Sequence, residues 1–537
     1  MSLNPSPALA AFLSFLFPGL GQIYAGSLRK GVLWALPMLA FILAVVWLLI
    51  GPRIALVGLV TNPQTRIAIL VFNAAFFLYH VAAMVDAYSL AKTERYRGFG
   101  RSSSAAPIAL AVLVAFTMVL HGVPEVIGVD VNSFLNAIGE GHNGVTSSFT
   151  PRPTAAETPT PLATPTPFAT DTPGTSGSPT DQPTDTPSAT SSGPTPSPMP
   201  CPQTDYSGWA PAADGRLNIL LTGSDSRSDT GASDTGIRTD SMMLLSVNIA
   251  TCQAALFSFP RNMGCDTRYP TWFAIPLENG QTFGDCLNAL WRAAAEDPVH
   301  YVTPPHPADQ TYQDTSDCQS HFDCLRAWRA LTNAIQDFAN EQIDGVISVN
   351  LKGFVSIIDA LPGQGVWIDV PAPGLQDLPT PCPTQQDPNH QCGYYNSQEQ
   401  LYPVNFAAGC QFLKGEDALA FARSRHQDDD YERARRQQIF LQQVRKQLDP
   451  LSLLGNIGSL ITAAQANLFM TFSQDDFPDL AQIASHIDAD RLYRDDFAPP
   501  RLTAVGSMDG MAAKISNIFS EPPPEPDPGQ PACPPKS

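Results

Sequence analysis

The sequence predicts a layered α/β domain that follows a helical membrane region and a long linker. Three observations support this organisation. The first 125 residues are strongly apolar, the next stretch almost lacks large apolar side chains, and the remainder alternates short apolar runs with segments of helical periodicity. With 537 residues the chain is too long for one typical domain. We therefore divide it into residues 1–125, 126–204, 205–500 and 501–537.

The first region contains apolar stretches that are long enough to cross a bilayer, which takes about 20 residues each. The stretch 8–24 is shorter and is interrupted by Pro18-Gly19, so it fits a span, a re-entrant hairpin or an interfacial helix. The three longer stretches, which predict transmembrane helices, lie at roughly 31–50, 67–91 and 105–123.

Lys and Arg in the short loops predict the orientation of these helices. The cations at 29–30 and at 92–101 fall on one side of the membrane, and only Arg53 and Arg66 fall on the other. The side with more cations is expected to be cytoplasmic. This arrangement places everything after about residue 124 outside the cytoplasm, in an integral plasma membrane protein.

The cysteines favour the same location for the second half of the chain. All ten lie at or after Cys201, and none has the spacing of a zinc site. An even number confined to one segment is typical of a disulfide-permissive compartment, whereas reduced thiols in a cytosolic domain are the alternative. The short separations predict local bridges between Cys318 and Cys324 and between Cys382 and Cys392.

Residues 126–204 are expected to form an extracytoplasmic spacer. From about residue 146 the chain consists mostly of Pro, Thr and Ser and lacks the apolar content to bury a core. Its prolines favour an extended, semi-rigid spacer, although a plain tether is equally compatible. Residues 501–537 are also rich in proline and are expected to be a disordered tail.

The segment 205–500 shows interleaved strand and helix signals, which are typical of a layered α/β domain. Short apolar runs predict strands at 217–222, 242–249, 254–259, 346–349 and 366–370. Helical periodicity predicts helices at 287–295, 322–340, 353–360, 415–422 and 431–448, with a closing helix at 477–487.

The charge balance argues against a nucleic-acid partner. The chain has 31 Lys and Arg against 50 Asp and Glu, a formal net charge of −19. Sequence-independent binding to nucleic acid needs a basic footprint. A transcriptional regulator is therefore disfavoured, as it also is by the predicted outward topology.

Two clusters of charged residues flank consecutive predicted strands. Asp225 and Arg227 directly follow the first strand, and Arg238 and Asp240 directly precede the second. If these strands are neighbours, the two carboxylates can face each other. Carboxylates beside arginines suit Mg²⁺ with phosphate, because Mg²⁺ is held by one or two carboxylates and the phosphates of its substrate. The alternative is an ordinary pair of loop carboxylates satisfied by arginine.

A third cluster, residues 423–437, is the densest in charge. Arg423 and Arg425 are two residues apart and would point to one side of an extended chain. Asp430 stands where a helix cap would, and Arg433 and Gln437 share one face of the helix that follows. Several arginines near a helix N-terminus favour phosphate binding. The alternative is a solvated, charged helix.

Five segments, in order, resemble the successive signatures of the LytR-CpsA-Psr family. They read NILLTGSDSR, RTDSMMLLSVN, ALFSFPRN, ISVNLKGFVSIIDALPG and GCQFLKGEDALAFARSRHQDDDYERARRQQ. The resemblance covers roughly residues 217–448 and extends to about residue 499.

The resemblance implies a mixed β-sheet flanked by helices, with an apolar cavity for a polyprenyl chain. It implies transfer of a phosphate-linked glycopolymer from a polyprenyl-pyrophosphate carrier to peptidoglycan or another wall glycan. The matching catalytic residues are Asp225, Asp240, Arg423 and Arg425, of which Asp225 and Asp240 would hold Mg²⁺ or Mn²⁺. The matching pyrophosphate-binding residues are Arg227, Arg238, Arg261, Asp430, Arg433 and Gln437.

The sequence departs from the family pattern at several places. Asn262 stands where the family usually has Asp, and no Lys precedes the segment Leu287-Asn288-Ala289. Two long inserts that contain cysteines, 297–320 and 374–404, are expected to reshape the rim of the cavity. Because of these departures, a polyprenyl-pyrophosphate hydrolase and a non-catalytic lipid- or polymer-binding protein remain as alternatives.

Overall fold

The structure is a computed structural model, and most of the folded chain can be described. The described residues are 5–50, 63–97, 106–119, 121, 201, 215–226, 237–302, 324–377, 394–398, 400–425, 430–448, 459–460, 463, 467–472, 476–499, 501–524 and 533. The predicted spacer from residue 146 onward lies outside these ranges up to residue 200.

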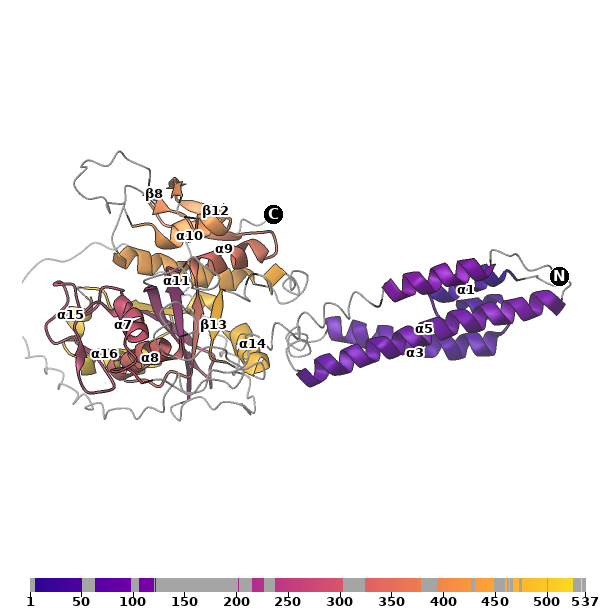
Figure 1. Ribbon diagram of the computed structural model, residues 1–537, viewed down its shortest axis with the longest axis horizontal. Helices are drawn as coiled ribbons and strands as arrows, with labels where there is room; N and C mark the ends of the chain where they lie inside the picture. Colours follow the sequence, from indigo (N-terminus) through magenta and orange to yellow (C-terminus); the bar gives the residue numbers. More distant parts are fainter. Residues whose placement is uncertain are drawn as a thin grey trace, which may run out of the picture.

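A six-stranded mixed sheet forms the centre of the α/β domain (Figure 1). β1 pairs antiparallel with β2 and parallel with β6, and β2 pairs antiparallel with β3. β13 and β14 form the two edges, in the strand order β13-β6-β1-β2-β3-β14. The strands are β1 (Arg216–Ser224), β2 (Thr239–Asn248), β3 (Ala254–Ser258), β6 (Gly345–Val349), β13 (Leu468–Met470) and β14 (Tyr493–Asp496). The prediction of a mixed sheet flanked by helices is therefore confirmed.

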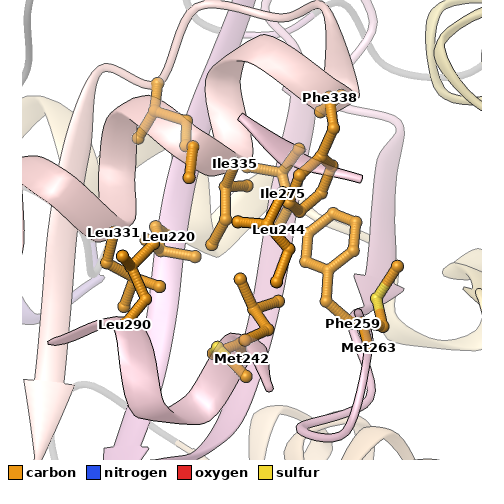
Figure 2. Packing of buried hydrophobic residues seen from close by; sticks show 14 of the residues in the cluster. Leu220, Met242, Leu244, Phe259, Met263, Ile275, Leu290, Leu331, Ile335 and Phe338 are labelled. Atoms are coloured by element: carbon orange, nitrogen blue, oxygen red, sulfur yellow. The ribbon is translucent and has the colours of Figure 1, made fainter. Parts of the chain in front are cut away.

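One face of the sheet is covered by three helices and is densely packed. These helices are α7 (Leu290–Glu296), α8 (Leu325–Ala339) and α16 (Met508–Ser516). Figure 2 shows Leu220 and Leu244 of the strands among Leu290 of α7 and Leu331 and Phe338 of α8. We call this side the filled face.

The opposite face is covered by α9 (Leu351–Ala360), α10 (Gly415–Arg423), α11 (Asp430–Gln447) and α14 (Phe477–His486). Asn350 caps α9 by accepting a hydrogen bond from the backbone N–H of Gly353 at 2.7 Å. The side chains of successive strand residues alternate between the two faces, so Leu220 belongs to the filled face and Leu221 to this one.

Small β-structures lie beside α10 and α11, within the second insert and on either side of it. β7 (Val366–Val370) pairs with β12 (Gly409–Leu413), and β8 (Leu375–Asp377) pairs with β11 (Val404–Phe406). A third pair joins β9 (Tyr394–Tyr395) to β10 (Leu401–Tyr402). The first insert lies largely outside the described residues.

The expected disorder of residues 501–537 is wrong for the first part of this segment. α15 (Arg501–Val505) and α16 fold onto the domain, and Leu502, Met511 and Ile515 are fully buried in the core of the filled face. Apolar residues spaced three to four apart explain this packing. The helix at 477–487 therefore does not close the domain, because β14, α15 and α16 follow it.

The disulfides join residues that are mostly distant in sequence. Cys201 is bonded to Cys252, Cys265 to Cys286, and Cys410 to Cys533. Cys324 is also disulfide-bonded, whereas Cys318, Cys382 and Cys392 lie outside the described residues. The predicted bridges Cys318–Cys324 and Cys382–Cys392 therefore stay predictions. Disulfides of this number are typical of an oxidising compartment.

The apolar N-terminal region forms helices where the sequence predicts them (Figure 1). Among the described residues, one segment, Ile67–Glu94 within α5 (Pro63–Arg97), is long and apolar enough by length and composition to cross a membrane. α3 (Leu28–Ile50) and a shorter apolar helix, Ala106–Val119, match the other two predicted stretches. The stretch 8–24 breaks at Pro18-Gly19 into α1 (Pro7–Leu16) and α2 (Leu20–Tyr24).

Candidate functional site

Two carboxylates meet where β1 ends and β2 begins. Because these strands are antiparallel neighbours, the end of β1 lies beside the start of β2. Asp225 and Asp240 therefore lie at the same end of this strand pair, beside a register shift between Gly223 and Ser224. The backbone of Arg238 fixes Asp225: its N–H donates to Asp225 Oδ1 at 2.7 Å, and its carbonyl accepts from Asp225 N–H at 3.1 Å. Both carboxylates line one cavity, as their positions in the sequence predict.

Asp240 is held by side chains from three separate segments. Its Oδ1 accepts from Arg261 Nη1 at 3.0 Å and from Asn288 Nδ2 at 3.1 Å. Its backbone carbonyl accepts from Arg433 Nη2 at 2.8 Å. Asn288 is absent from the residues predicted to form the site. The sequence feature that could have identified it is the segment Leu287-Asn288-Ala289, where the family comparison noted only the absence of a preceding Lys.

Asp430, the first residue of α11, binds three arginines. Its carboxylate lies 3.2 Å from Arg261 Nε, 3.4 Å from Arg425 Nη1 and 3.5 Å from Arg433 Nη1. The sequence suggested a helix cap at this position, but the structure shows an ion-pair centre that connects two predicted pyrophosphate ligands, Arg261 and Arg433, with the predicted catalytic Arg425. We call the group Asp240, Arg261, Arg425, Asp430 and Arg433 the charged mouth.

Arg423 and Arg425 do not form the extended pair that their spacing suggested. Arg423 is the last residue of α10, and the chain leaves the helix at Ser424. Side chains of α11 hold this turn: Arg436 Nε donates to the Phe421 carbonyl at 3.1 Å, and Gln437 Nε2 donates to the Ala422 carbonyl at 3.0 Å. These donors satisfy carbonyls that the end of a helix leaves without partners.

The second insert reaches the same turn. Asp377 of β8 is buried and accepts a hydrogen bond from Ser424 Oγ at 2.5 Å. The guanidinium of Arg423 lies over the ring of Tyr394, 5.7 Å from its centroid. The prediction that this insert reshapes the rim therefore takes a specific form, in which two of its residues contact Arg423 and Ser424. Neither Asp377 nor Tyr394 could be identified from sequence spacing.

Ion pairing fixes the protonation states in the charged mouth. Burial raises the pKa of the Asp240 carboxyl, but Arg261 and Arg433 outweigh it and lower that pKa to about 2. Burial lowers the pKa of Arg433 to about 10, even though Asp240 and Asp430 act in the other direction. Burial likewise opposes ionisation of Asp430, but Arg433 and Arg261 lower its pKa overall. Asp240, Asp430 and Arg433 are therefore ionised at neutral pH.

A cavity of about 320 Å³ runs from the charged mouth into the space between the sheet and α9, α10 and α11. We call it the sheet–helix cavity. Its polar end includes Asp225, Asp240, Arg423, Arg433 and Gln437. Its body is apolar and is lined by Leu221, Met243, Ile347, Val349, Phe354, Ile358, Leu419, Phe440 and Val444.

Several buried polar atoms beside this cavity have no hydrogen-bond partner. They are Arg433 Nε, Thr222 Oγ1, Ser224 Oγ and Asn350 Nδ2, each on a residue that lines the cavity. A buried donor without a partner costs about 1–3 kcal/mol. Thr222 shares a side of β1 with Leu220, so of these atoms Arg433 Nε is the one that offers a donor at the charged end.

Two predicted ligands are not placed in the site by the structure. Arg238 is exposed and contributes backbone atoms rather than its guanidinium. Arg227 lies outside the described residues. Arg435 lies outside the site: its Nη1 is 2.7 Å from Glu432 Oε1 on the exposed side of α11.

The carboxylates offer the plausible ligands for a divalent cation. Asp225 and Asp240 together supply the one or two carboxylates with which proteins typically hold Mg²⁺ beside phosphate. Among the residues that the structure describes, the one group of three clustered potential ligands is Cys265, Asp285 and Cys286. Its two cysteines form a disulfide, so this group does not fit a metal.

Comparison with known proteins places these features in a family. The LytR_cpsA_psr family model matches residues 184–268 and 328–497. These two segments contain both carboxylates, Arg261 and the whole of α10 and α11.

Curated relatives match part of this region. A protein named polyisoprenyl-teichoic acid–peptidoglycan teichoic acid transferase TagU, from Bacillus cereus, is 30% identical over 148 residues, which cover 27% of this chain and 40% of TagU. The cell wall biosynthesis protein LcpA of Corynebacterium glutamicum is 25% identical over 273 residues, covering 48% of this chain and 44% of LcpA. The chain thus matches less than half the length of these relatives.

Solved structures also match the domain. The crystal structure of TagV from B. subtilis covers 58% of this chain and 99% of its own, with 17% identity and a TM-score of 0.36. A Streptococcus agalactiae protein, gbs0355, covers 53% of this chain and 77% of its own, with 18% identity and a TM-score of 0.35.

Proposed function

Because the chain belongs to the LytR-CpsA-Psr family, we propose that it transfers a phosphate-linked glycopolymer from a polyprenyl-pyrophosphate carrier to a hydroxyl of peptidoglycan or another wall glycan. The names of its relatives TagU and LcpA support glycopolymer transfer in general. The observation that carries the proposal is the shape of the sheet–helix cavity, which joins a charged end to an apolar body. An amphiphile with an anionic head and a hydrocarbon tail fits both ends.

The charged mouth would hold the pyrophosphate. Arg261, Arg425 and Arg433 surround Asp430 at 3.2–3.5 Å, so their guanidinium groups already converge on one point. Guanidinium groups recognise phosphate oxygens with two parallel hydrogen bonds. The buried Nε of Arg433, which lacks a partner, would donate to such an oxygen.

We propose Mg²⁺, or Mn²⁺ in its place, as the cofactor, with Asp225 and Asp240 as its protein ligands. When bound, the cation would neutralise charge on the pyrophosphate and on the leaving phosphate. The two carboxylates would then complete an otherwise cationic site and position the reacting phosphorus.

The proposed reaction is a substitution at the phosphorus that is linked to the glycan. The acceptor hydroxyl oxygen forms a new P–O bond, the P–O bond to the bridging oxygen breaks, and polyprenyl phosphate leaves with the bonding electron pair. Arg423, Arg425 and Arg433 would stabilise the charge on that leaving group. The hydroxyl proton must pass to a base.

Asp240 is a poor candidate for that base. A general base works best when its pKa lies near the working pH, and Arg261 and Arg433 outweigh burial to hold the pKa of Asp240 at about 2. We assign Asp240 to holding the cation and ordering the arginines. Asp225 lines the same cavity and is the remaining carboxylate that we assign to accept the proton.

We also propose that catalysis occurs outside the cytoplasm. The helix that contains Ile67–Glu94 would anchor the chain in the plasma membrane. The disulfides of the α/β domain fit an extracytoplasmic location, and the excess of Lys and Arg around 29–30 and 92–101 fits a cytoplasmic side. The carrier lipid and the wall acceptor are both accessible from outside the cytoplasm.

The test uses the full chain in detergent with Mg²⁺, a polyprenyl-pyrophosphate-linked glycan and peptidoglycan fragments, with products identified by mass spectrometry. We expect a phosphodiester-linked product together with polyprenyl monophosphate. Free phosphorylated glycan without a linked product would instead indicate a hydrolase. Bound lipid without turnover would indicate a binding protein.

Two variants test the role of the arginines. Arg423→Ala and Arg425→Ala should each lower the transfer rate about 100- to 1,000-fold, the loss typical of removing one preorganised donor, with unchanged thermal unfolding. Arg435→Ala is the matched control, because Arg435 pairs with Glu432 on the exposed side of α11, away from the charged mouth. Transfer at the wild-type rate in either test variant would contradict this assignment.

A further inference from the structure

A second cavity lies next to the sheet–helix cavity at Val444. It measures about 340 Å³ and shares Val444 of α11 with the first cavity. We call it the distal cleft and define it by Leu361, Gly363, Trp367, Phe412, Val444 and Leu448. Its two aromatic residues, Trp367 and Phe412, lie on the paired strands β7 and β12.

The same two helices form walls of both cavities. On α11, Gln437, Phe440 and Val444 line the sheet–helix cavity, and Leu448 continues this face one turn later into the distal cleft. Arg433 at the charged mouth and Val444 are eleven residues apart, or about 16 Å along a helix.

α9 follows the same course on the opposite side. Phe354 and Ile358 line the sheet–helix cavity, and Leu361, directly after the end of α9, lines the distal cleft. Phe354 packs against Phe440 of α11, with ring centroids 5.2 Å apart, so the two helices approach each other along this course. The distal cleft therefore continues the apolar path that begins at the charged mouth.

The chemistry of the distal cleft suits a hydrocarbon rather than a sugar. The rings of Trp367 and Phe412 lie 5.2 Å apart, and Phe412 is 37% exposed. Gln447 satisfies the backbone of Trp367 on both sides, accepting from its N–H at 2.8 Å and donating to its carbonyl at 2.7 Å. Lys446, the charged residue of the lining, is paired with Asp490.

Two glycines shape the cleft: Gly365 lets the Phe412 ring pack against the backbone, and Gly363 borders open space. A Cβ on Gly365 would lie 2.7 Å from the Phe412 ring and 2.6 Å from the Leu413 carbonyl, so only glycine lets this ring pack here. Gly363, with φ +87°, has no atom within 4 Å of such a Cβ and borders open space. A side chain at Gly363 would project into the cleft.

We propose that the distal cleft binds the far isoprenoid units of the carrier lipid, those that extend beyond the sheet–helix cavity. This inference rests on the proposed function and adds a preference for long carriers to it. Removing apolar surface from water favours binding. Contact with two aromatic rings therefore strengthens the binding of a long chain. A short carrier ends before Val444 and gains nothing from the cleft.

The experiment compares two donors with the same glycan, one on a farnesyl carrier and one on an undecaprenyl carrier. The full chain is reconstituted in phospholipid nanodiscs with Mg²⁺ and peptidoglycan fragments. For Phe412→Ala and Trp367→Ala, we expect KM for the undecaprenyl donor to rise about tenfold, which corresponds to about 1.4 kcal/mol. KM for the farnesyl donor should change less than about twofold on the same reasoning.

The controls separate this inference from the function on which it rests. Leu401→Ala removes an exposed apolar side chain outside the cleft and should leave both KM values unchanged. Phe412→Leu, which keeps an apolar side chain, should restore most of the undecaprenyl affinity. Wild-type KM in both alanine variants, or equal increases for the two donors, would overturn the inference. No turnover of either donor by the wild-type chain would overturn the proposed function instead.

Discussion

The two faces of the central sheet differ in how completely they are packed. On the filled face, Trp291 and Trp328 are fully buried and their rings meet edge to face at 5.8 Å. On the other face, α9, α10 and α11 leave a cavity of about 320 Å³. The same strands supply both surfaces, since Leu220 and Met242 point one way and Leu221 and Met243 the other.

This difference separates stability from binding. A filled core gains contacts from every buried side chain, whereas a side chain beside a void has no partner atoms on one side. A cavity of this size is therefore costly for folding and is expected where a ligand completes the packing. Packing on the filled face stabilises the fold and offsets the cost of the cavity on the opposite face.

The two faces also meet at the charged mouth. Arg261 and Asn288 bind Asp240 from the filled side, and their near neighbours Met263 and Leu287 are fully buried in the core of the filled face. Two backbone hydrogen bonds connect these segments, from Leu287 N–H to the Met263 carbonyl at 2.9 Å and from Asn288 N–H to the Arg261 carbonyl at 3.1 Å. Packing on one face thus positions ligands for the other.

Adjacent leucines on β1 give the most direct test of the contrast. Leu220→Ala should lower the free energy of unfolding by about 3–5 kcal/mol, because it leaves a hole in a tightly packed core. Leu221→Ala should cost less than half as much, because Leu221 borders the sheet–helix cavity. Urea denaturation of both variants and the wild type measures the two losses.

The same residue type on the same strand makes these variants controls for each other. Similar losses for Leu220→Ala and Leu221→Ala would mean that the cavity is not open in solution. A long-carrier lipid added before unfolding should stabilise the wild-type chain and should leave the difference at Leu220 unchanged.

The disulfide between Cys265 and Cys286 gives the next test, since it connects the two segments that carry Arg261 and Asn288. Cys286 also stands directly before Leu287, where the family usually has Lys. The double variant Cys265→Ser/Cys286→Ser should lose about 3 kcal/mol of stability, the value for closing a loop of this size. It should also lose transfer activity at temperatures where it remains folded, because Arg261 and Asn288 become less ordered.

Cys410→Ser/Cys533→Ser is the control for this variant. That bridge closes a longer loop, of 123 residues, so its loss should cost at least as much stability. It joins β12 to the C-terminal segment and contacts no residue of the charged mouth, so transfer by the folded protein should be retained. Equal activity losses in the two double variants would show that Cys265 and Cys286 contribute only to stability.

Most of the sheet and its helices could be predicted from local patterns. The run Leu217–Thr222 lies within β1, and the periodicity of 322–340 corresponds to α8, which ends at Asn340 in the left-handed conformation that Asn tolerates. The packed segment 501–520 was missed because its proline-rich continuation dominated the composition, although its apolar residues have helical spacing.

The site was predictable where family signatures or spacing applied, and not where tertiary contacts decide. Asp225, Asp240, Arg433 and Gln437 all line the cavity. Arg238 is exposed and contacts Asp225 through its backbone, and spacing cannot tell whether a side chain or its backbone faces a site. Asp377 lies 47 residues before Ser424, which it binds, and no local pattern signals a contact over that distance.

The pH dependence of Asp240 provides the smallest expected effect and the test most specific to the charged mouth. Burial raises the pKa of Asp240, but Arg261 and Arg433 outweigh it and lower that pKa from 3.8 to about 2. A carboxyl with a lowered pKa stabilises the folded state above its unfolded pKa, and this contribution is lost as pH falls through the folded pKa. The contribution should be about 2 kcal/mol. Asp240→Asn should therefore be less stable than the wild type at pH 5, and this gap should shrink by about that amount as the pH falls from about 4 to 2. Urea titrations measure the difference in the free energy of unfolding between Asp240→Asn and the wild type. A difference that does not change over this pH range would mean that the arginines of the mouth do not hold Asp240 ionised, and the mouth would then not be a charged end of the cavity as argued above.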